Sequence, residues 1–300
     1  MTTTLNHIIA IVVCVLASDI QFIACSITPA IDGDKLVGVC NEDGTKYGFQ
    51  KVTGEIVIPP IYDQTGDFHD GLAAVCVNGY WGYIDQTGKN VTQIKYSNAM
   101  DFKEGMAVVC IDEKFGFIDK KGKEVVSPMY NWAHHFAEGV ASVEQNGKYG
   151  FIDKRGKVII PFKYDSADFF FDGLAIVVDG AMYGCIDIKG NEVVPLKYNY
   201  IEHFSEGVSA VELNHKHGYI DKTGKEVIPF LYEATYSFHE GLGMAILNGR
   251  CGFIDHDGNE VIPFKYEWAN NFENGRAKVG INGRTYFIDK EGNEVEAPGE

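Results

Sequence analysis

The stretch KYGFIDKRGKVIIPFKY, residues 148–164, contains most of a unit that recurs along the chain. Residues 149–152 form a short run of aromatic and β-branched side chains, which predicts a β-strand. Asp153 and Gly156 stand at the first and last positions of a type I turn, where the aspartate carboxylate can accept a backbone N–H. Residues 158–161 predict a second strand that ends at its proline, which cannot donate to a neighbouring strand and belongs at a sheet edge. The stretch therefore predicts two antiparallel strands joined by a tight turn.

A third strand is expected before each such pair. Residues 174–178 are apolar and lead into an Asp-Gly dipeptide. Asn-Gly or Asp-Gly between two strands is the strongest short signal for a hairpin. The dipeptide stands between the same two strands at Asn78-Gly79, Asn146-Gly147, Asp179-Gly180, Asn248-Gly249 and Asn282-Gly283. The unit is therefore expected to be a three-stranded antiparallel meander.

The unit repeats every 34 residues without a change of register. Three series of residues follow this period: Tyr62, Tyr96, Tyr130, Tyr164, Tyr198, Tyr232 and Tyr266; Phe68, Phe102, Phe136, Phe170, Phe204, Phe238 and Phe272; and Gly71, Gly105, Gly139, Gly173, Gly207, Gly241 and Gly275. Such self-similarity is typical of repeat proteins, in which each unit packs only on its neighbours.

Eight whole meanders fit between residues 36 and 296. A single meander buries too little apolar surface to be stable alone, so the repeated Tyr and Phe side chains are expected to fill a core between neighbouring units. We expect an all-β tandem array that is open and superhelical. A closed β-propeller-like ring is the alternative, although propeller blades usually have four strands and about 40–45 residues.

The composition restricts the partners. The formal net charge is −16, which repels nucleic-acid phosphate and anionic lipid and would suit a cationic partner. No binding to nucleic acid is expected, and no membrane insertion beyond a possible N-terminal anchor. The seven cysteines include no CxxC pair. They are interpreted as small buried hydrophobic residues, not as a disulfide framework or a zinc site.

Residues 1–25 differ from the array, which is assigned to residues 26–300. Residues 8–16 form an apolar run with the length of a signal-peptide core rather than of a membrane span. Ile23-Ala24-Cys25 loosely resembles a bacterial lipoprotein cleavage box with Cys25 as the lipidated residue. These features predict export or attachment to the cell envelope. The alternative is an N-terminal cap that packs on the first repeat of a cytoplasmic protein.

Residues 80–85 (YWGYID) and their copies resemble the WG-repeat family, also called KWG repeats. Residues 227–232 (VIPFLY) and 238–242 (FHEGL) carry the same resemblance, which extends over residues 36–296. The tryptophan of the family name stands only at Trp81. The resemblance implies a largely bacterial repeat module that mediates binding, and it implies no catalytic residues.

Two series of acidic residues are interpreted as structural. Aspartates open the tight turns singly, without the many oxygen ligands that Ca²⁺ needs, and are expected to cap those turns: Asp85, Asp119, Asp153, Asp187, Asp221, Asp255 and Asp289. Acids before glycine are expected to accept a hydrogen bond from the backbone of the following turn: Asp70, Glu104, Glu138, Asp172, Glu206 and Glu240. No catalytic residue, metal ligand or cofactor is expected, because a residue repeated in every unit is a poor candidate for an asymmetric active site.

Function is expected where the repeats differ, in the five places between the fixed Tyr and the fixed Phe. The third place is small or apolar in most copies and is expected to point inward. The second and fourth places collect aromatic and histidine side chains that would form a row suited to peptide or sugar contact if they are exposed. Otherwise they pack on the next unit. The candidate ligand-binding residues are Trp132, His134, His135, Tyr200, His203, Tyr236 and Trp268.

The function expected from these features is a non-catalytic scaffold that binds a protein or peptide. One alternative is a carbohydrate-binding module of the cell envelope, in which Trp132, Tyr200 and Trp268 stack on cell-wall sugars. Another is a hydrolase built on a propeller-like ring with carboxylates at its mouth.

Overall fold

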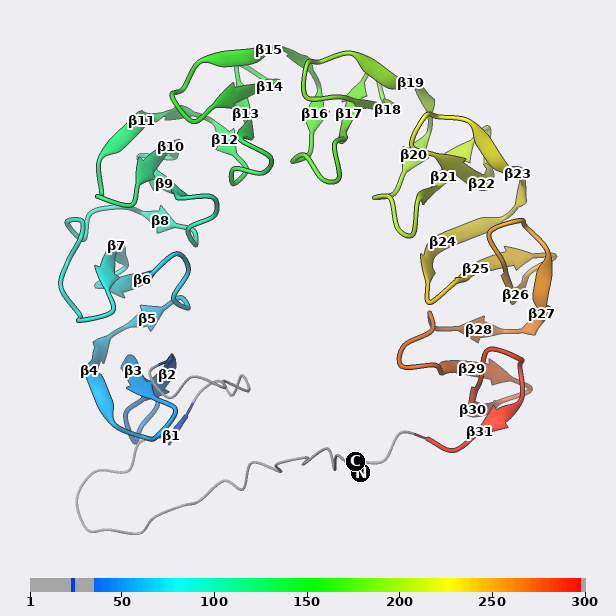
Figure 1. Ribbon diagram of the computed structural model, residues 1–300, viewed down its shortest axis with the longest axis horizontal. Helices are drawn as coiled ribbons and strands as arrows, with labels where there is room; N and C mark the ends of the chain where they lie inside the picture. Colours follow the sequence, from blue (N-terminus) through cyan, green and yellow to red (C-terminus); the bar gives the residue numbers. More distant parts are fainter. Residues whose placement is uncertain (1–22, 25–34, 298–300) are drawn as a thin grey trace, which may run out of the picture. The chain divides into compact units, whose positions relative to one another are not determined.

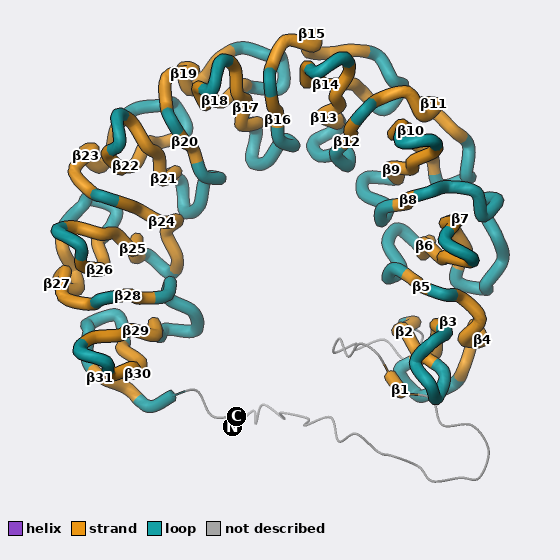
Figure 2. The backbone as a smooth tube through the Cα atoms, turned by 180° about the vertical axis from the view of Figure 1, so that it is seen from behind, coloured by secondary structure: helices purple, strands orange, loops and turns teal. Residues whose placement is uncertain are grey.

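The computed structural model describes residues 23–24 and 35–297, and these residues form strands, turns and loops with no helix (Figure 2). The chain divides into two compact units, Met1–Pro128 and Met129–Glu300. Most of the proposed signal-like segment, Cys25 included, lies outside the described residues. Within them, no helix has the length and hydropathy of a membrane span.

The strands form eight separate antiparallel sheets in tandem, and none of the sheets built from the described residues closes on itself. Unit 1 contains β1 (Ile23–Ala24), β2 (Leu36–Cys40), β3 (Tyr47–Lys51) and β4 (Ile56–Tyr62); then β5 (Gln64–Thr65), β6 (Leu72–Val77) and β7 (Tyr80–Asp85); then β8 (Asn98–Ala99), β9 (Met106–Ile111), β10 (Lys114–Asp119) and β11 (Glu124–Tyr130), whose last residues cross into unit 2. The all-β tandem array expected from the sequence is therefore confirmed.

Unit 2 contains the other five sheets. They are β12 (Trp132–Ala133), β13 (Val140–Gln145), β14 (Lys148–Asp153) and β15 (Val158–Tyr164); β16 (Ser166–Ala167), β17 (Ala175–Asp179), β18 (Met182–Ile186) and β19 (Glu192–Tyr198); β20 (Tyr200–Ile201), β21 (Val208–Leu213), β22 (Lys216–Asp221) and β23 (Glu226–Tyr232); β24 (Ala234–His239), β25 (Leu242–Leu247), β26 (Arg250–Ile254) and β27 (Glu260–Tyr266); and β28 (Trp268–Ala269), β29 (Ala277–Ile281), β30 (Arg284–Ile288) and β31 (Glu294–Val295).

Seven of the eight predicted meanders are present in full, and in β5–β7 the last strand of the meander is reduced to isolated bridges. Each of the eight sheets gains one further strand at the open edge of its meander. This strand comes from the variable stretch and pairs at the open edge of the meander, as β12 does when Trp132 faces Glu144 and Ala133 faces Val143 (Figure 1). In β1, Ile23 and Ala24 take the same place opposite Cys40 and Val39. The sequence does not predict this strand. In all sheets but that of β24 only two of its residues pair, and their side chains differ from unit to unit.

The second strand of the quoted stretch does not end at its proline. β15 continues through Pro161 to Tyr164, as the edge strand of its sheet. Ile160 pairs with Phe151 and Tyr164 pairs with Tyr149, and β15 bulges between these two pairs. Pro161 lies in the bulge, where its lack of a backbone N–H removes no hydrogen bond from the ladder. The bulge passes close to Gly150, where a Cβ would lie 2.7 Å from the Ile160 carbonyl oxygen. The glycine of each Trp-Gly position is thus required by close approach of the neighbouring backbone.

The sheet β5–β7 is three-stranded because its last segment, residues 90–96, keeps only isolated bridges from Trp81 to Tyr96 and from Ile84 to Asn90. Thr92 stands where other repeats carry a buried aliphatic residue, and its hydroxyl accepts the Tyr83 backbone N–H at 2.9 Å. The Thr92 hydroxyl therefore accepts a backbone N–H that would otherwise pair with a backbone carbonyl of the neighbouring strand.

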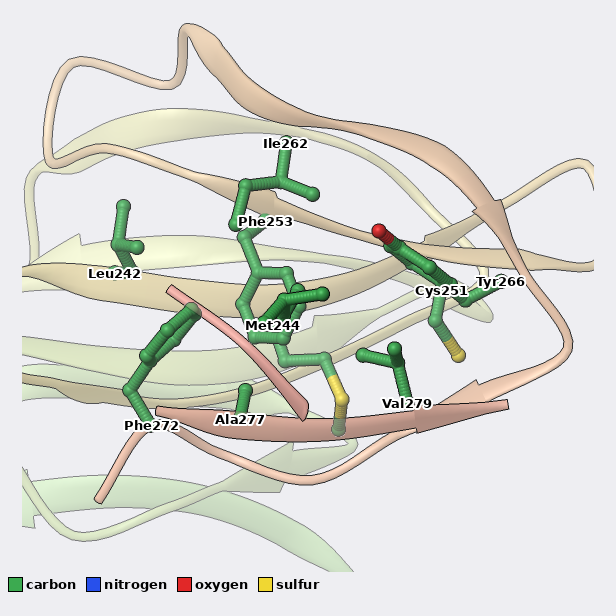
Figure 3. Packing of buried hydrophobic residues seen from close by; sticks show 10 residues of the cluster. Leu242, Met244, Cys251, Phe253, Ile262, Tyr266, Phe272, Ala277 and Val279 are labelled. Carbon is green, nitrogen blue, oxygen red and sulfur yellow. The ribbon is translucent and has the colours of Figure 1, made fainter. Parts of the chain in front are cut away.

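Aromatic side chains join consecutive sheets, as the sequence predicted. The repeated Phe of one sheet contacts the central ring of the preceding one, and Phe151 and Phe170 have centroids 5.0 Å apart. The same contact recurs at 4.6–5.0 Å in Phe49–Phe68, Tyr83–Phe102, Tyr219–Phe238 and Phe253–Phe272. Figure 3 shows one such core, in which Phe253 and Tyr266 of one sheet meet Phe272 and Val279 of the next.

The acids before glycine form a second link between sheets. Glu206 and Gly207 have positive φ angles of 52° and 90°, which makes a tight hairpin turn of the Asn-Gly kind. The Glu206 carboxylate accepts the backbone N–H of Gly241 at 3.0 Å, and Gly241 belongs to the same turn of the next sheet. Equivalent bonds join Asp70 to Gly105, Glu138 to Gly173 and Glu240 to Gly275. The expected bond to a following turn is present, and that turn lies one repeat further on.

The aspartates of the tight turns cap those turns, as predicted. Asp153 Oδ1 accepts the backbone N–H groups of Arg155 and Lys157, both at 2.9 Å. The same pair of bonds forms at Asp85, Asp119, Asp187, Asp221, Asp255 and Asp289. The described cysteines, Cys40, Cys76, Cys110, Cys185 and Cys251, are buried, which agrees with their interpretation as small core residues.

Replacing one inter-sheet ring tests the aromatic link. Phe170 is 2% exposed, so Phe170→Ala is expected to destabilise the fold by about 3–5 kcal/mol through lost burial and a residual cavity. Its neighbour Phe171 is 53% exposed, and Phe171→Ala should cost about 0.5 kcal/mol or less. Urea unfolding of the two variants measures both effects. Equal losses would contradict the role given to the buried ring.

Candidate functional site

The candidate aromatic residues lie at the solvent-facing edge of their sheets. Trp132, Tyr200 and Trp268 are the first residues of β12, β20 and β28, and their exposed fractions are 39%, 45% and 40%. Tyr236, in β24, is 38% exposed. The third places point inward, as predicted: Ala133, Ala167, Ile201 and Thr235 are buried. The rings therefore do not sit in the inter-sheet core.

These rings do not form one continuous site. Trp268 lies across its own sheet. Its indole covers Gly280 so closely that a Cβ at Gly280 would lie 2.1 Å from the indole Nε1. Trp132 contacts His134, with ring centroids 6.0 Å apart. Only Tyr200, His134 and His203, of the seven candidate residues, line the same cavity.

This cavity, named here the His203 cavity, has a volume of about 640 Å³ and lies in unit 2. Its walls come from β17, β18 and the variable stretches of four consecutive sheets. The lining residues are His134, Ser166, Ala167, Asp168, Ile176, Val178, Tyr183, Tyr200, Ile201, Glu202, His203 and Ser237. Most of these side chains occupy places where the repeats differ, and none belongs to the repeated Tyr, Phe or Gly series.

Ser166 explains why the space is open here. It is the second place of its repeat, opposite Val178, whereas the second place holds an indole at Trp132 and Trp268. A small hydroxyl side chain leaves the strand surface uncovered between Tyr183 and Tyr200.

An ion pair stands at one wall of the His203 cavity. His203 Nε2 lies 3.0 Å from Asp168 Oδ2, and Asp168 Oδ1 accepts the Phe169 backbone N–H at 2.8 Å. The hydrogen bond to Asp168 raises the pKa of His203 above its usual value. Burial opposes ionisation of Asp168, but the bonds from His203 and Phe169 outweigh it and lower the pKa of this carboxyl. Burial lowers the pKa of His134, against the attraction of Asp168.

Three histidines meet around one phenylalanine. The Phe169 ring has its centroid 4.9 Å from that of His135, 6.2 Å from His134 and 5.7 Å from His203. The Phe169 ring contacts all three imidazoles, so an apolar ring lies among the three histidines where a shared metal ion would be needed. Across residues 23–24 and 35–297, no group of three or more His, Cys, Asp or Glu side chains could hold a metal ion.

The opposite wall combines tyrosines with a carboxylate. Tyr183 and Tyr200 pack edge to face with centroids 5.6 Å apart. Glu202 Oε2 accepts the Ser237 hydroxyl at 2.7 Å, which positions the carboxylate beside them. Burial, followed by the charge of Glu202, raises the pKa of Tyr200, so this phenol stays neutral.

A second cavity in unit 2 has a different character. Its volume is about 1070 Å³, and it is lined by His239, Asn270, Asn271, Phe272, Glu273, Asn274, Arg276, Lys278 and Phe287. Arg276 and Lys278 stand where the preceding repeat carries Leu242 and Met244. This cavity contains none of the candidate residues, and its basic side chains contrast with the acids of the His203 cavity.

Several residues of the His203 cavity and its rim were missed in the sequence, among them Asp168, Phe169 and Tyr183. Asp168 and Phe169 occupy the fourth and fifth places of their stretch, and Phe169 is the one apolar residue at a fifth place otherwise held by Asp101, His135, His203, Ser237 and Asn271. That departure is the signal that could have found it. Tyr183 stands at the Trp position of the family motif, which is common to the repeats, and it also lines the cavity.

The comparisons with known proteins agree with the repeat. The model of the WG-containing repeat matches seven consecutive segments: residues 47–81, 81–115, 115–149, 149–181, 183–216, 218–251 and 252–284. The chain belongs to the WG-repeat family. No curated protein matches the sequence.

Solved structures show what this WG-repeat fold is similar to. A crystal structure of "the eukaryotic initiation factor" matches with a TM-score of 0.50 and 10% identity, over 88% of this chain and 85% of that one. Hsv2 of Kluyveromyces lactis matches with a TM-score of 0.39 and 9% identity, over 89% and 97% of the two chains. At such identity the first likeness concerns the fold alone, which is β-propeller-like.

The ion pair of the WG-repeat cavity can be tested directly. Asp168→Asn removes the charge that favours the protonated imidazole, so the pKa of His203 is expected to fall. The pKa of His134 should also fall, by less, because Asp168 acts on it only through space. NMR titration of the histidine ring protons measures both. An unchanged His203 titration would show that the pair does not form in solution.

Proposed function

We propose that this WG-repeat protein is a non-catalytic scaffold that binds a protein or peptide, and that the His203 cavity is its binding site. The observation that carries the proposal is that common and variable residues of the repeat have different structural roles. Residues common to the units build turns and inter-sheet cores, whereas the cavity is lined mainly by places where the units differ. A binding surface on a repeat scaffold is expected at such places.

The chemistry of the cavity favours binding over catalysis. The His203–Asp168 pair resembles the base and orienting acid of a hydrolase, but a nucleophile would also be needed. In the described part of the chain, His203 has no hydroxyl or thiol as a hydrogen-bond partner. The thiol of Cys185, in β18 of the preceding sheet, is fully buried, and burial raises its pKa to about 12.

A carbohydrate ligand is the second candidate. Tyr200, one of the proposed sugar-stacking residues, does line the cavity together with acids and hydroxyls. The other two, Trp132 and Trp268, lie outside it, which favours the peptide. Export or attachment to the cell envelope remains our proposal for where the protein acts, based on residues 1–25.

Filling the cavity provides the test. Ser166→Trp places at β16 the indole that Trp132 and Trp268 carry at the same place of their own repeats, so the fold should be retained. Peptides selected from a displayed random library on the wild-type protein are expected to bind this variant at least about tenfold more weakly. Fluorescence polarisation with the selected peptides measures the affinities.

Asn98→Trp is the matched control, because Asn98 is the exposed second place of a sheet in unit 1 and should leave binding unchanged. Selected peptides that bind wild type and Ser166→Trp equally would contradict the assigned site. Oligosaccharides that bind wild type and not Ser166→Trp, with no peptide selected, would replace the peptide by the sugar.

A further inference from the structure

We infer that the His203 cavity accepts a positively charged side chain, the ammonium of lysine or the guanidinium of arginine, from the bound peptide. The inference rests on the proposed function, since it names the chemistry of the ligand at the same site. It is carried by one carboxylate, two tyrosine rings and the balance of charge around them.

Glu202 supplies the negative charge. Of the two carboxylates that line the cavity, Asp168 is already matched by His203 and by the Phe169 N–H. Glu202 receives one hydrogen bond, from the Ser237 hydroxyl to Oε2, and a single bond leaves most of the acceptor capacity of a carboxylate available. A cation that enters the cavity can therefore form a charge-assisted hydrogen bond to Glu202.

The tyrosines supply the second contact. Tyr183 is half-buried and Tyr200 is exposed, and their rings are edge-to-face neighbours on the cavity wall. A cation near a ring face is attracted by the negative potential of the π system. The chain uses this contact elsewhere: the Nζ atoms of Lys163, Lys197 and Lys265 lie 4.8–5.1 Å from the ring centroids of the tyrosines that follow them.

The surroundings favour a cation at this cavity over the other one. The chain carries a net charge of −16, which attracts basic peptides over a distance of several ångströms. Arg276 and Lys278 would repel a cation from the second cavity, whereas the His203 cavity has no Lys or Arg in its lining.

The charge of His203 makes the affinity depend on pH. The groups that face this ring are Asp168, Glu202 and the rings of Phe169 and Phe171, and His134 acts on the same Asp168. The bond to Asp168 raises the pKa of His203, so the imidazole keeps its charge to a higher pH than a free histidine and loses it as the pH rises through that raised pKa. Loss of this proton makes the cavity more negative by one charge. Binding of a cation should therefore tighten as the pH rises, while lysine and arginine stay charged.

The experiment uses the full chain and four capped tripeptides, Ac-Gly-Xaa-Gly-NH₂, in which Xaa is lysine, arginine, norleucine or glutamate. At pH 8.5 the lysine and arginine peptides are expected to bind at least about tenfold more tightly than the norleucine peptide, which has the same apolar stem. Glu202→Gln keeps a partner for Ser237 and should remove about tenfold of that affinity. NMR chemical-shift titration measures these weak affinities.

Glu226→Gln removes one carboxylate from β23, outside the cavity, and serves as the charge-matched control that should not change binding. His203→Gln should abolish the gain in affinity between pH 5.5 and pH 8.5. Equal binding of all four peptides, lost in Ser166→Trp, would overturn the charge inference and leave peptide binding intact. Binding of none of them, with library peptides that lack Lys and Arg still bound, would overturn it in the same way. If no library peptide binds either, the proposed function fails as well.

Discussion

The fold depends on the contact between the repeated Phe of one sheet and the central ring of the sheet before it. Strand pairing within each sheet is local, and a small sheet of this size is not stable alone. The Phe151–Phe170 contact and its copies bury large rings on the face that each sheet turns toward its neighbour. The hydrogen bond that the Gly241 N–H donates to Glu206 fixes how consecutive sheets are aligned, because it forms only when their hairpin turns are in line.

This arrangement frees the variable stretch from a structural role. The residue at the third place still packs inward, as Ala167 does. The backbone of the stretch still pairs with the first strand of the meander that follows it, as β16 pairs with β17. The second and fourth side chains contribute little to the core, so they can differ among repeats at small cost in stability. The division follows from geometry, since alternate residues of a short edge strand point to opposite faces.

Much of the fold follows from the sequence because the signals are local and repeated. Asp153 with Gly156 and Asn146 with Gly147 specify two turns, and the strands between them follow. The fourth strand and the continuation past Pro161 were missed for different reasons. The fourth strand is set by backbone pairing that no side chain records, and the bulge depends on Gly150, whose neighbour in space is ten residues away along the chain.

The candidate site could be predicted only in part. Tyr200, His134 and His203 were singled out from their places in the repeat, but their partner Asp168 emerges only when consecutive sheets are side by side. The His203–Asp168 pair joins residues 35 apart, one repeat and one place, and no periodic pattern distinguishes that pairing from many others. Trp132 and Trp268 were chosen for their ring type, yet a large ring covers the edge that a ligand would need.

The position of the His203 cavity follows from a second departure from the repeat. In β18 of the sheet β16–β19, Cys185 stands at the position of the central ring, which is Phe151 in β14 and Tyr219 in β22. Phe204 of the next sheet therefore lacks the aromatic partner that Phe170 and Phe238 have. Phe204 is only partly buried where it packs against the core that contains Cys185. The junction with the weakest aromatic link is thus the one with Ser166 at its edge and the cavity at its surface. A loss of packing at one junction and a small side chain beside it together make room for a ligand, while the turns and the remaining rings hold the sheets in register.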